Sequence, residues 1–110
     1  MRNDQNIAGR FAHAISIEDY DFLDQSYEVA RLWVEHKGSA ACLIQPNNLD
    51  EPEMFGMLMV DCVRHAARAY AQTLDITEGD ALERIWTGLD AERDKNTTDL
   101  DTVQNFGKAN

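Results

Sequence analysis

The stretch that decides the fold is Asp50–Gln72, DEPEMFGMLMVDCVRHAARAYAQ. Its apolar residues recur at helical spacing, which predicts a long helix from about Asp50 to Thr73. Asp50 suits the N-cap of this helix, and Pro52 suits its first turn. The apolar residues nearly encircle the helix instead of forming one stripe. A chain of 110 residues has few other elements to cover such a helix, so the sequence raises the question of what covers it.

Two segments before this helix carry patterns of their own. Residues 11–17, FAHAISI, place their larger side chains on one side at period two and predict a short strand. Residues 20–37 carry apolar residues at i, i+4, i+7 and i+11, which predicts a helix with Trp33 in the core. The same helix would pair Glu28 with Arg31 at i, i+3. Gly38 would then be its C-cap.

Two further elements complete the predicted order. Residues 39–45, SAACLIQ, predict a second strand, which ends at Pro46 because proline lacks the N–H donor of the ladder. Thr77, with Asp80 three residues on, is typical of a helix N-terminus and begins a third helix. The predicted order is (β)-α-β-α-α, a small α+β domain that is mostly helical. In it a short strand or two-stranded ribbon packs on three helices.

The composition fits one domain and excludes several classes of protein. Hydrophobic residues make up 44% of the chain, which predicts a globular fold in residues 11–93. Residues 1–10 and 94–110 are polar and are expected to be flexible. The net charge of −10 excludes a nucleic-acid binder and an anionic membrane surface, and permits a basic protein partner.

The cysteines and the N-terminus bear on localisation. Cys42 and Cys62 form no CxxC pair and no disulfide framework, so we expect two buried, reduced thiols in a cytoplasmic protein. The N-terminus lacks an apolar signal region, and no apolar run reaches the length of a membrane span. Secretion and membrane insertion are therefore not expected.

Several short motifs resemble a family of small, uncharacterised bacterial proteins that occur chiefly in alphaproteobacteria. The resemblance covers roughly residues 28–92. Phe55 stands where that family is expected to have Trp, and Gln45 stands where a basic residue is expected. The resemblance implies a fold and a cytoplasmic setting, and it implies no reaction. The motifs are Arg31-Leu32-Trp33-Val34, Leu49-Asp50-Glu51-Pro52, Gly56-Met57-Leu58, Asp61, Arg64-His65 and Arg68-Ala69-Tyr70.

One side of the Asp50–Gln72 helix is polar. Asp61, Arg64, His65 and Arg68 follow i, i+3, i+4 and i+7, so they share a face that we call the polar ridge. Asp61 could orient His65 while the two arginines hold a carboxylate or phosphate, which makes the ridge a candidate anion-binding site. The alternative is an ordinary solvated face, since pairs such as Asp61–Arg64 are common on helices.

The sequence predicts no metal site and no cofactor. Cys62 and His65 lie one turn apart and could touch one metal ion, but structural zinc sites need about four ligands. The simpler explanation, and the one that we expect, is that Cys62 is a small buried apolar residue. No catalytic residue stands out, because the chain has no nucleophile elbow and no Gly-rich phosphate loop.

Two functions remain open from the sequence. The first is a non-enzymatic protein-interaction or regulatory module that acts as a homodimer through the second helix, the 39–45 strand or both. The competing arrangement is a monomer in which residues 11–17 complete the sheet. The second function is a small-anion binding or catalytic domain that uses Asp61, Arg64, His65 and Arg68.

Overall fold

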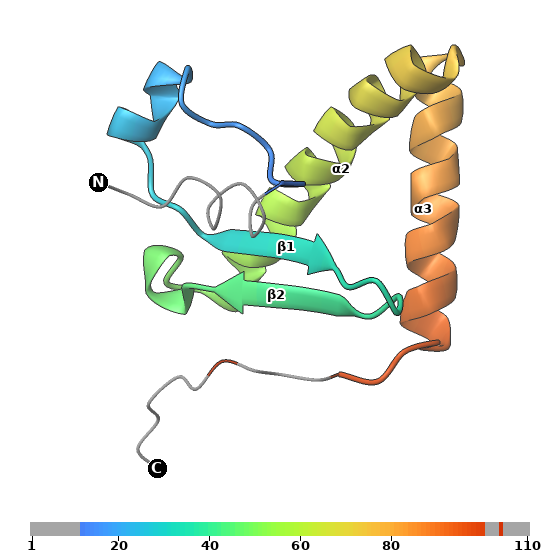
Figure 1. The fold of residues 1–110 in the computed structure, drawn as a ribbon. Helices are drawn as coiled ribbons and strands as arrows, with labels where there is room; N and C mark the ends of the chain where they lie inside the picture. Colours follow the sequence, from blue (N-terminus) through green and yellow to red (C-terminus); the bar gives the residue numbers. More distant parts are fainter. Residues whose placement is uncertain (1–11, 101–103, 105–110) are drawn as a thin grey trace.

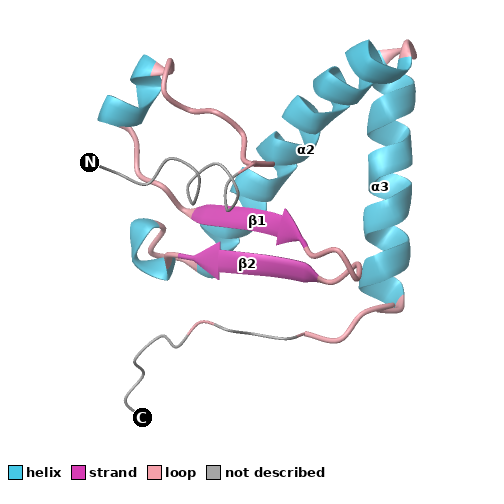
Figure 2. Cartoon of the chain, viewed as in Figure 1, coloured by secondary structure: helices cyan, strands magenta, loops and turns pink. Residues whose placement is uncertain are grey.

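The computed structural model describes residues 12–100 and Gln104. The described chain forms a two-stranded antiparallel sheet and two α-helices (Figures 1 and 2). The α+β class predicted from the sequence, with more helix than strand, is confirmed. The elements in chain order are η1 (Asp21–Gln25), β1 (Ala30–Val34), β2 (Ala40–Ile44), η2 (Pro46–Asn48), α2 (Pro52–Leu74) and α3 (Glu78–Asp94).

β1 and β2 form a hairpin in which Ala30 lies opposite Ile44 and Val34 lies opposite Ala40. The connection is closed by two backbone hydrogen bonds that Glu35 makes. Its N–H donates to Ser39 O at 2.7 Å, and its carbonyl accepts from Gly38 N–H at 2.8 Å. Gly38 has φ +102, a value that glycine adopts without a steric penalty. The predicted 39–45 strand is thus present as β2.

The helix predicted over residues 20–37 is wrong. That segment holds the short 3-10 helix η1, strand β1 and the start of the hairpin turn. The apolar residues Val29, Leu32 and Trp33 suit a strand as well as a helix, so spacing alone did not separate the two. Gly38 shapes the hairpin turn and does not cap a helix.

The strand predicted over residues 11–17 is also wrong. Residues 12–17 form a turn followed by irregular chain, and Phe11 lies outside the described residues. The two-stranded ribbon expected from the sequence exists, but its members are β1 and β2. The predicted set of three helices is reduced to two α-helices within the described residues.

α2 confirms the helix that was predicted in the second half of the chain. It begins at Pro52, where the missing N–H costs nothing, and it is 23 residues long. Asp50 is not its N-cap: Glu51 holds that position, and it makes no side-chain capping hydrogen bond. The helix ends at Asp75, which adopts the left-handed conformation with φ 55 and donates its N–H to Ala71 O.

α3 begins as predicted, because the Thr77 hydroxyl accepts a hydrogen bond from Asp80 N–H at 3.0 Å. α2 and α3 meet at the short connection between them and diverge from it, as Figure 1 shows. Ala67 of α2 and Ala81 of α3 are the only fully buried residues in the part of the chain that the structure describes. Complete burial among the described residues is therefore limited to these two alanines, and much of the length of both helices stays uncovered.

Several side chains expected in a core are exposed. Trp33 keeps 44% of its surface exposed, so its prediction as a core residue is wrong for the single chain. Cys42 and Cys62 are free thiols as expected, but both are exposed and not buried. Among the described residues, no helix combines the length and the apolar character that crossing a membrane requires.

Candidate functional site

The polar ridge of Asp61, Arg64, His65 and Arg68 lies on α2, and all four side chains are exposed. Arg64 Nη1 lies 3.8 Å from Asp61 Oδ1, which is a long ion pair between neighbouring turns. Arg68 Nε donates to Glu78 Oε2 at 3.2 Å and so reaches from α2 to α3. Each guanidinium of the ridge therefore already has a carboxylate partner.

The ridge can offer positive charge and N–H donors to an anion, but only in competition with these carboxylates and with water. Exposed pairs are weak, so a bound anion would have to displace Asp61 from Arg64 and Glu78 from Arg68 at modest cost. His65 lies on the same face, and it is exposed as well. The anion-binding role of the ridge remains a prediction.

Cys62 and His65 sit one turn apart on α2, as the sequence indicated. Among residues 12–100 and Gln104, no three His, Cys, Asp or Glu side chains come together in a group that could hold a metal ion. The structure thus brings no third ligand from the described residues to the Cys62–His65 pair.

A second surface was not predicted from the sequence. A cavity of about 410 Å³ opens between η1, the start of β1 and the first half of α2, and we call it the apolar groove. Cys62 lines it from α2, whereas the sequence predicted a buried thiol. The sequence anticipated only the side of the groove that α2 forms, because apolar residues nearly encircle that helix. Its other apolar lining residues include Ile17, Phe22, Leu23, Tyr27, Leu32, Leu58 and Met59.

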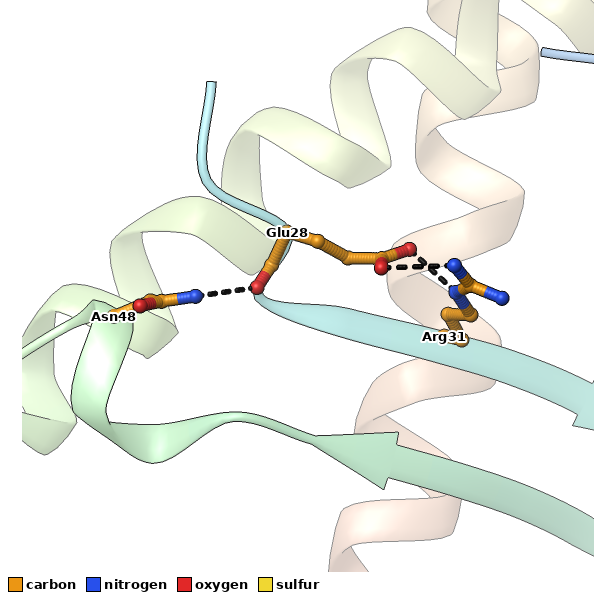
Figure 3. A network of polar contacts seen from close by, with 3 residues as sticks. All are labelled: Glu28, Arg31 and Asn48. Atoms are coloured by element: carbon orange, nitrogen blue, oxygen red, sulfur yellow. Dashed lines mark hydrogen bonds and ion pairs between the residues drawn. The ribbon is translucent and has the colours of Figure 1, made fainter. Parts of the chain in front are cut away.

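Glu28, Arg31 and Asn48 form a polar network beside the start of β1 (Figure 3), and two of them, Glu28 and Arg31, also line the groove. Arg31 donates through Nε and Nη2 to the two carboxylate oxygens of Glu28. This hydrogen bond lowers the pKa of Glu28 from its ordinary value. Asn48 Nδ2 donates to the carbonyl of Glu28 at 2.7 Å and so ties η2 to the entry of β1. The Glu28–Arg31 pair was expected from the sequence, but on a helix.

The outer edge of β2 carries a further contact that the sequence did not suggest. Ile44 N–H donates to Gln104 Oε1 at 2.9 Å, and Gln104 Nε2 donates to Ile44 O at 2.9 Å. The two residues are 60 positions apart, so no local pattern could have indicated the pair. Gln104 lies in the stretch that the sequence predicts as a flexible tail, and its side chain binds the backbone of β2.

Comparisons with known proteins add a family and a structural neighbour. A family model described as Domain of unknown function (DUF5076) matches residues 20–97. A solved structure from the photosynthetic bacterium Rhodopseudomonas, described as "a putative pyruvate dehydrogenase", is similar with a TM-score of 0.60 and 35% sequence identity. The match covers 80% of this chain and 86% of that chain. No curated protein matches the sequence significantly.

Proposed function

We propose, from the premise that this chain belongs to the DUF5076 family of domains of unknown function, that it is a cytoplasmic, non-enzymatic protein-interaction module. It acts as a homodimer in which the apolar groove and the uncovered apolar residues of α2 form the interface. The regulatory or scaffolding role of such a module would be exerted through the assembled pair.

The observation that carries the proposal is the lack of a core in the described part of the single chain. No side chain larger than alanine is fully buried there. A domain of about this size ordinarily buries large apolar side chains, since their removal from water is the main force that offsets the loss of chain entropy. The missing core is supplied if a second chain covers the exposed apolar residues.

The exposed apolar surface supplies a large part of the area that such an interface needs. Phe22 and Tyr27 line one side of the groove and are 60% and 81% exposed. Tyr20, whose ring lies 5.8 Å from that of Phe22, is 56% exposed. With roughly 150–250 Å² for each aromatic side chain, these three leave on the order of 300–500 Å² uncovered. Leu32 and Met57, which are 60% and 69% exposed, extend the apolar surface toward the roughly 800 Å² that each partner of a standard interface buries.

The net charge of the chain gives a way to distinguish a homodimer from a complex with a basic protein, because salt affects the two in opposite directions. A basic protein would be attracted by the net charge of −10, and added salt would weaken that complex. Two copies that each carry −10 repel one another, so salt screens the repulsion and strengthens a dimer held by apolar contacts. The apolar lining of the groove favours the second copy.

Sedimentation equilibrium at micromolar concentration tests the homodimer. We expect a species of twice the chain mass of 12.5 kDa, and we expect the dimer to strengthen with added NaCl. Leu58→Glu places a charge in the groove and should give monomers. Leu100→Glu is the matched control, because Leu100 is 94% exposed and lies outside the groove. A single 12.5 kDa species for the unmodified chain would refute the proposal.

The second candidate function is small-anion binding at the polar ridge. It is favoured by the alignment of Arg64, His65 and Arg68 on one exposed face of α2. The Rhodopseudomonas neighbour is described as "a putative pyruvate dehydrogenase", and pyruvate is a small carboxylate of the kind that paired arginines recognise.

Titration with pyruvate and with inorganic phosphate, followed by the NMR signals of the His65 ring, tests this candidate. Saturable shifts that vanish in Arg64→Gln/Arg68→Gln would support a ridge site. Arg84→Gln is the control, because Arg84 lies on α3 and outside the ridge. Shifts that are linear in ligand concentration, or equal in both variants, would exclude it.

A further inference from the structure

The contact between Gln104 and Ile44 has the form of a β-bridge in which a side chain replaces a strand. Gln45 N–H donates to Val29 O at 2.8 Å, so the backbone groups of Gln45 point toward the β1 side of the sheet. Because neighbouring residues of an antiparallel strand point their backbone groups to opposite sides, the N–H and C=O of Ile44 face outward. Gln104 satisfies both groups with one amide, at 2.9 Å each.

A side-chain amide carries the same donor and acceptor as a peptide group, so Gln104 supplies the ladder partner that a further strand would otherwise offer to Ile44. By the period of two, Ala40 and Cys42 present their backbone groups on the same outer edge. Proteins commonly protect such edges with lysine or proline. The strand sequence AACLI contains neither, and it contains no charged residue at all.

We infer that the outer edge of β2 is a strand-addition surface for β2 of a second copy, and that Gln104 closes this surface. The outward groups of Ala40, Cys42 and Ile44 are arranged symmetrically about Cys42. Antiparallel pairing of two copies centred on Cys42 would place Ala40 opposite the Ile44 of the other copy. This pairing uses the N–H and C=O of Ile44, so a second copy and Gln104 exclude one another.

This surface is separate from the apolar groove, because the groove is lined from β1 and α2 and not from β2. The inference therefore does not rest on the groove dimer. The closed edge would keep self-association confined to the groove, and opening it would join copies through a continuous sheet.

Cysteine cross-linking measures directly how much of the protein pairs through the outer edge of β2. Two Cys42 residues in a hydrogen-bonded antiparallel pair would have Cα atoms about 5.5 Å apart, within the ~4.4–6.8 Å range of disulfides. Cys62→Ser removes the other free thiol, and Cys42 is exposed. In this background, mild oxidation with copper phenanthroline followed by a non-reducing gel measures the Cys42-linked dimer.

Gln104→Ala removes both hydrogen bonds to Ile44, and we expect about a tenfold or larger rise in the cross-linked fraction at low concentration. Gln104→Glu keeps an acceptor but loses the donor, so we expect an intermediate rise. Asn96→Ala is the matched control: it removes an amide that donates to Glu92 O, and it should leave the cross-link unchanged.

Every other outcome overturns the inference. Equal cross-linking with and without Gln104 would show that this residue does not close the edge. No cross-link in either protein would show that the edge does not take a second copy. Repeating the series with Leu58→Glu present keeps the result independent of the groove dimer, since failure of that dimer alone leaves the cross-link intact.

Discussion

Arg68 Nε lies 3.2 Å from Glu78 Oε2 and joins the C-terminal third of α2 to the first residue of α3. The two residues are ten positions apart, so this pair is formed by the corner between the helices and not by one helical turn. Glu78 also sits at the N-terminus of α3, where the helix dipole favours a negative charge. Both side chains are more than half exposed, which limits what the contact can contribute to stability.

Replacing Arg68 by alanine is expected to lower the free energy of unfolding by only about 0.2–1 kcal/mol, because the Arg68–Glu78 pair is exposed. Urea denaturation measures the change. Arg64→Ala is the companion variant, since its partner Asp61 lies farther away at 3.8 Å, and it should change stability less. A loss of several kcal/mol for Arg68→Ala would mean that the ridge is buried in the assembled protein.

Replacing Trp33 by alanine is expected to cost about 2 kcal/mol in the single chain. Replacing a fully buried tryptophan by alanine costs about 3–5 kcal/mol of stability. The expected cost is smaller here because Trp33 keeps 44% of its surface in water. Urea denaturation of the Leu58→Glu protein, which is expected to be monomeric, with and without Trp33→Ala, measures this value. A cost near zero would place Trp33 outside any packed surface, whereas a cost of 4 kcal/mol or more on this scale would restore it to a core.

Two glycine replacements are expected to act in opposite directions. Gly88→Ala lies inside α3 with open space around the added Cβ, so it should stabilise the protein by about 0.5–1 kcal/mol. Gly38→Ala lies at φ +102 in the hairpin turn, so it should destabilise by roughly 1–2 kcal/mol despite equally open space. Thermal unfolding of both variants checks the sign, and a stabilising Gly38→Ala would contradict the turn geometry.

Glu92 is expected to titrate below the ordinary range of a glutamate. The backbone N–H of Thr97 donates to it at 2.7 Å, and the Thr97 hydroxyl donates as well, and these bonds lower the pKa of Glu92. A lowered carboxyl pKa stabilises the fold above the ordinary pKa of glutamate, and this stabilisation is lost as pH falls through the lowered value.

Thr97→Val keeps the N–H and removes the hydroxyl, so the pKa of Glu92 should rise part of the way toward its ordinary value. NMR titration of the carboxyl carbon measures it. Thr98→Val is the control, because Thr98 contacts Glu92 through its backbone. An unchanged pKa in Thr97→Val would show that the hydroxyl does not bind the carboxylate.

The candidate sites differ in whether the sequence alone could predict them. The polar ridge was predicted because its four residues lie within one helix, where spacing alone places Asp61 and Arg68 on one face. The apolar groove was not, because Phe22, Leu32 and Leu58 come from three elements that meet only in the folded chain. The Ile44–Gln104 bridge was missed for the same reason, since it spans 60 positions.

The sequence by itself determined α2 and the start of α3. Pro52 and the helical spacing of the apolar residues specify the first, and the Thr77–Asp80 capping hydrogen bond specifies the second, because these signals act within one or two helical turns. Only the tertiary structure decided that residues 30–34 form a strand. A strand forms its hydrogen bonds with another segment, here Ala40–Ile44, so the pairing lies outside the local pattern that suggested a helix.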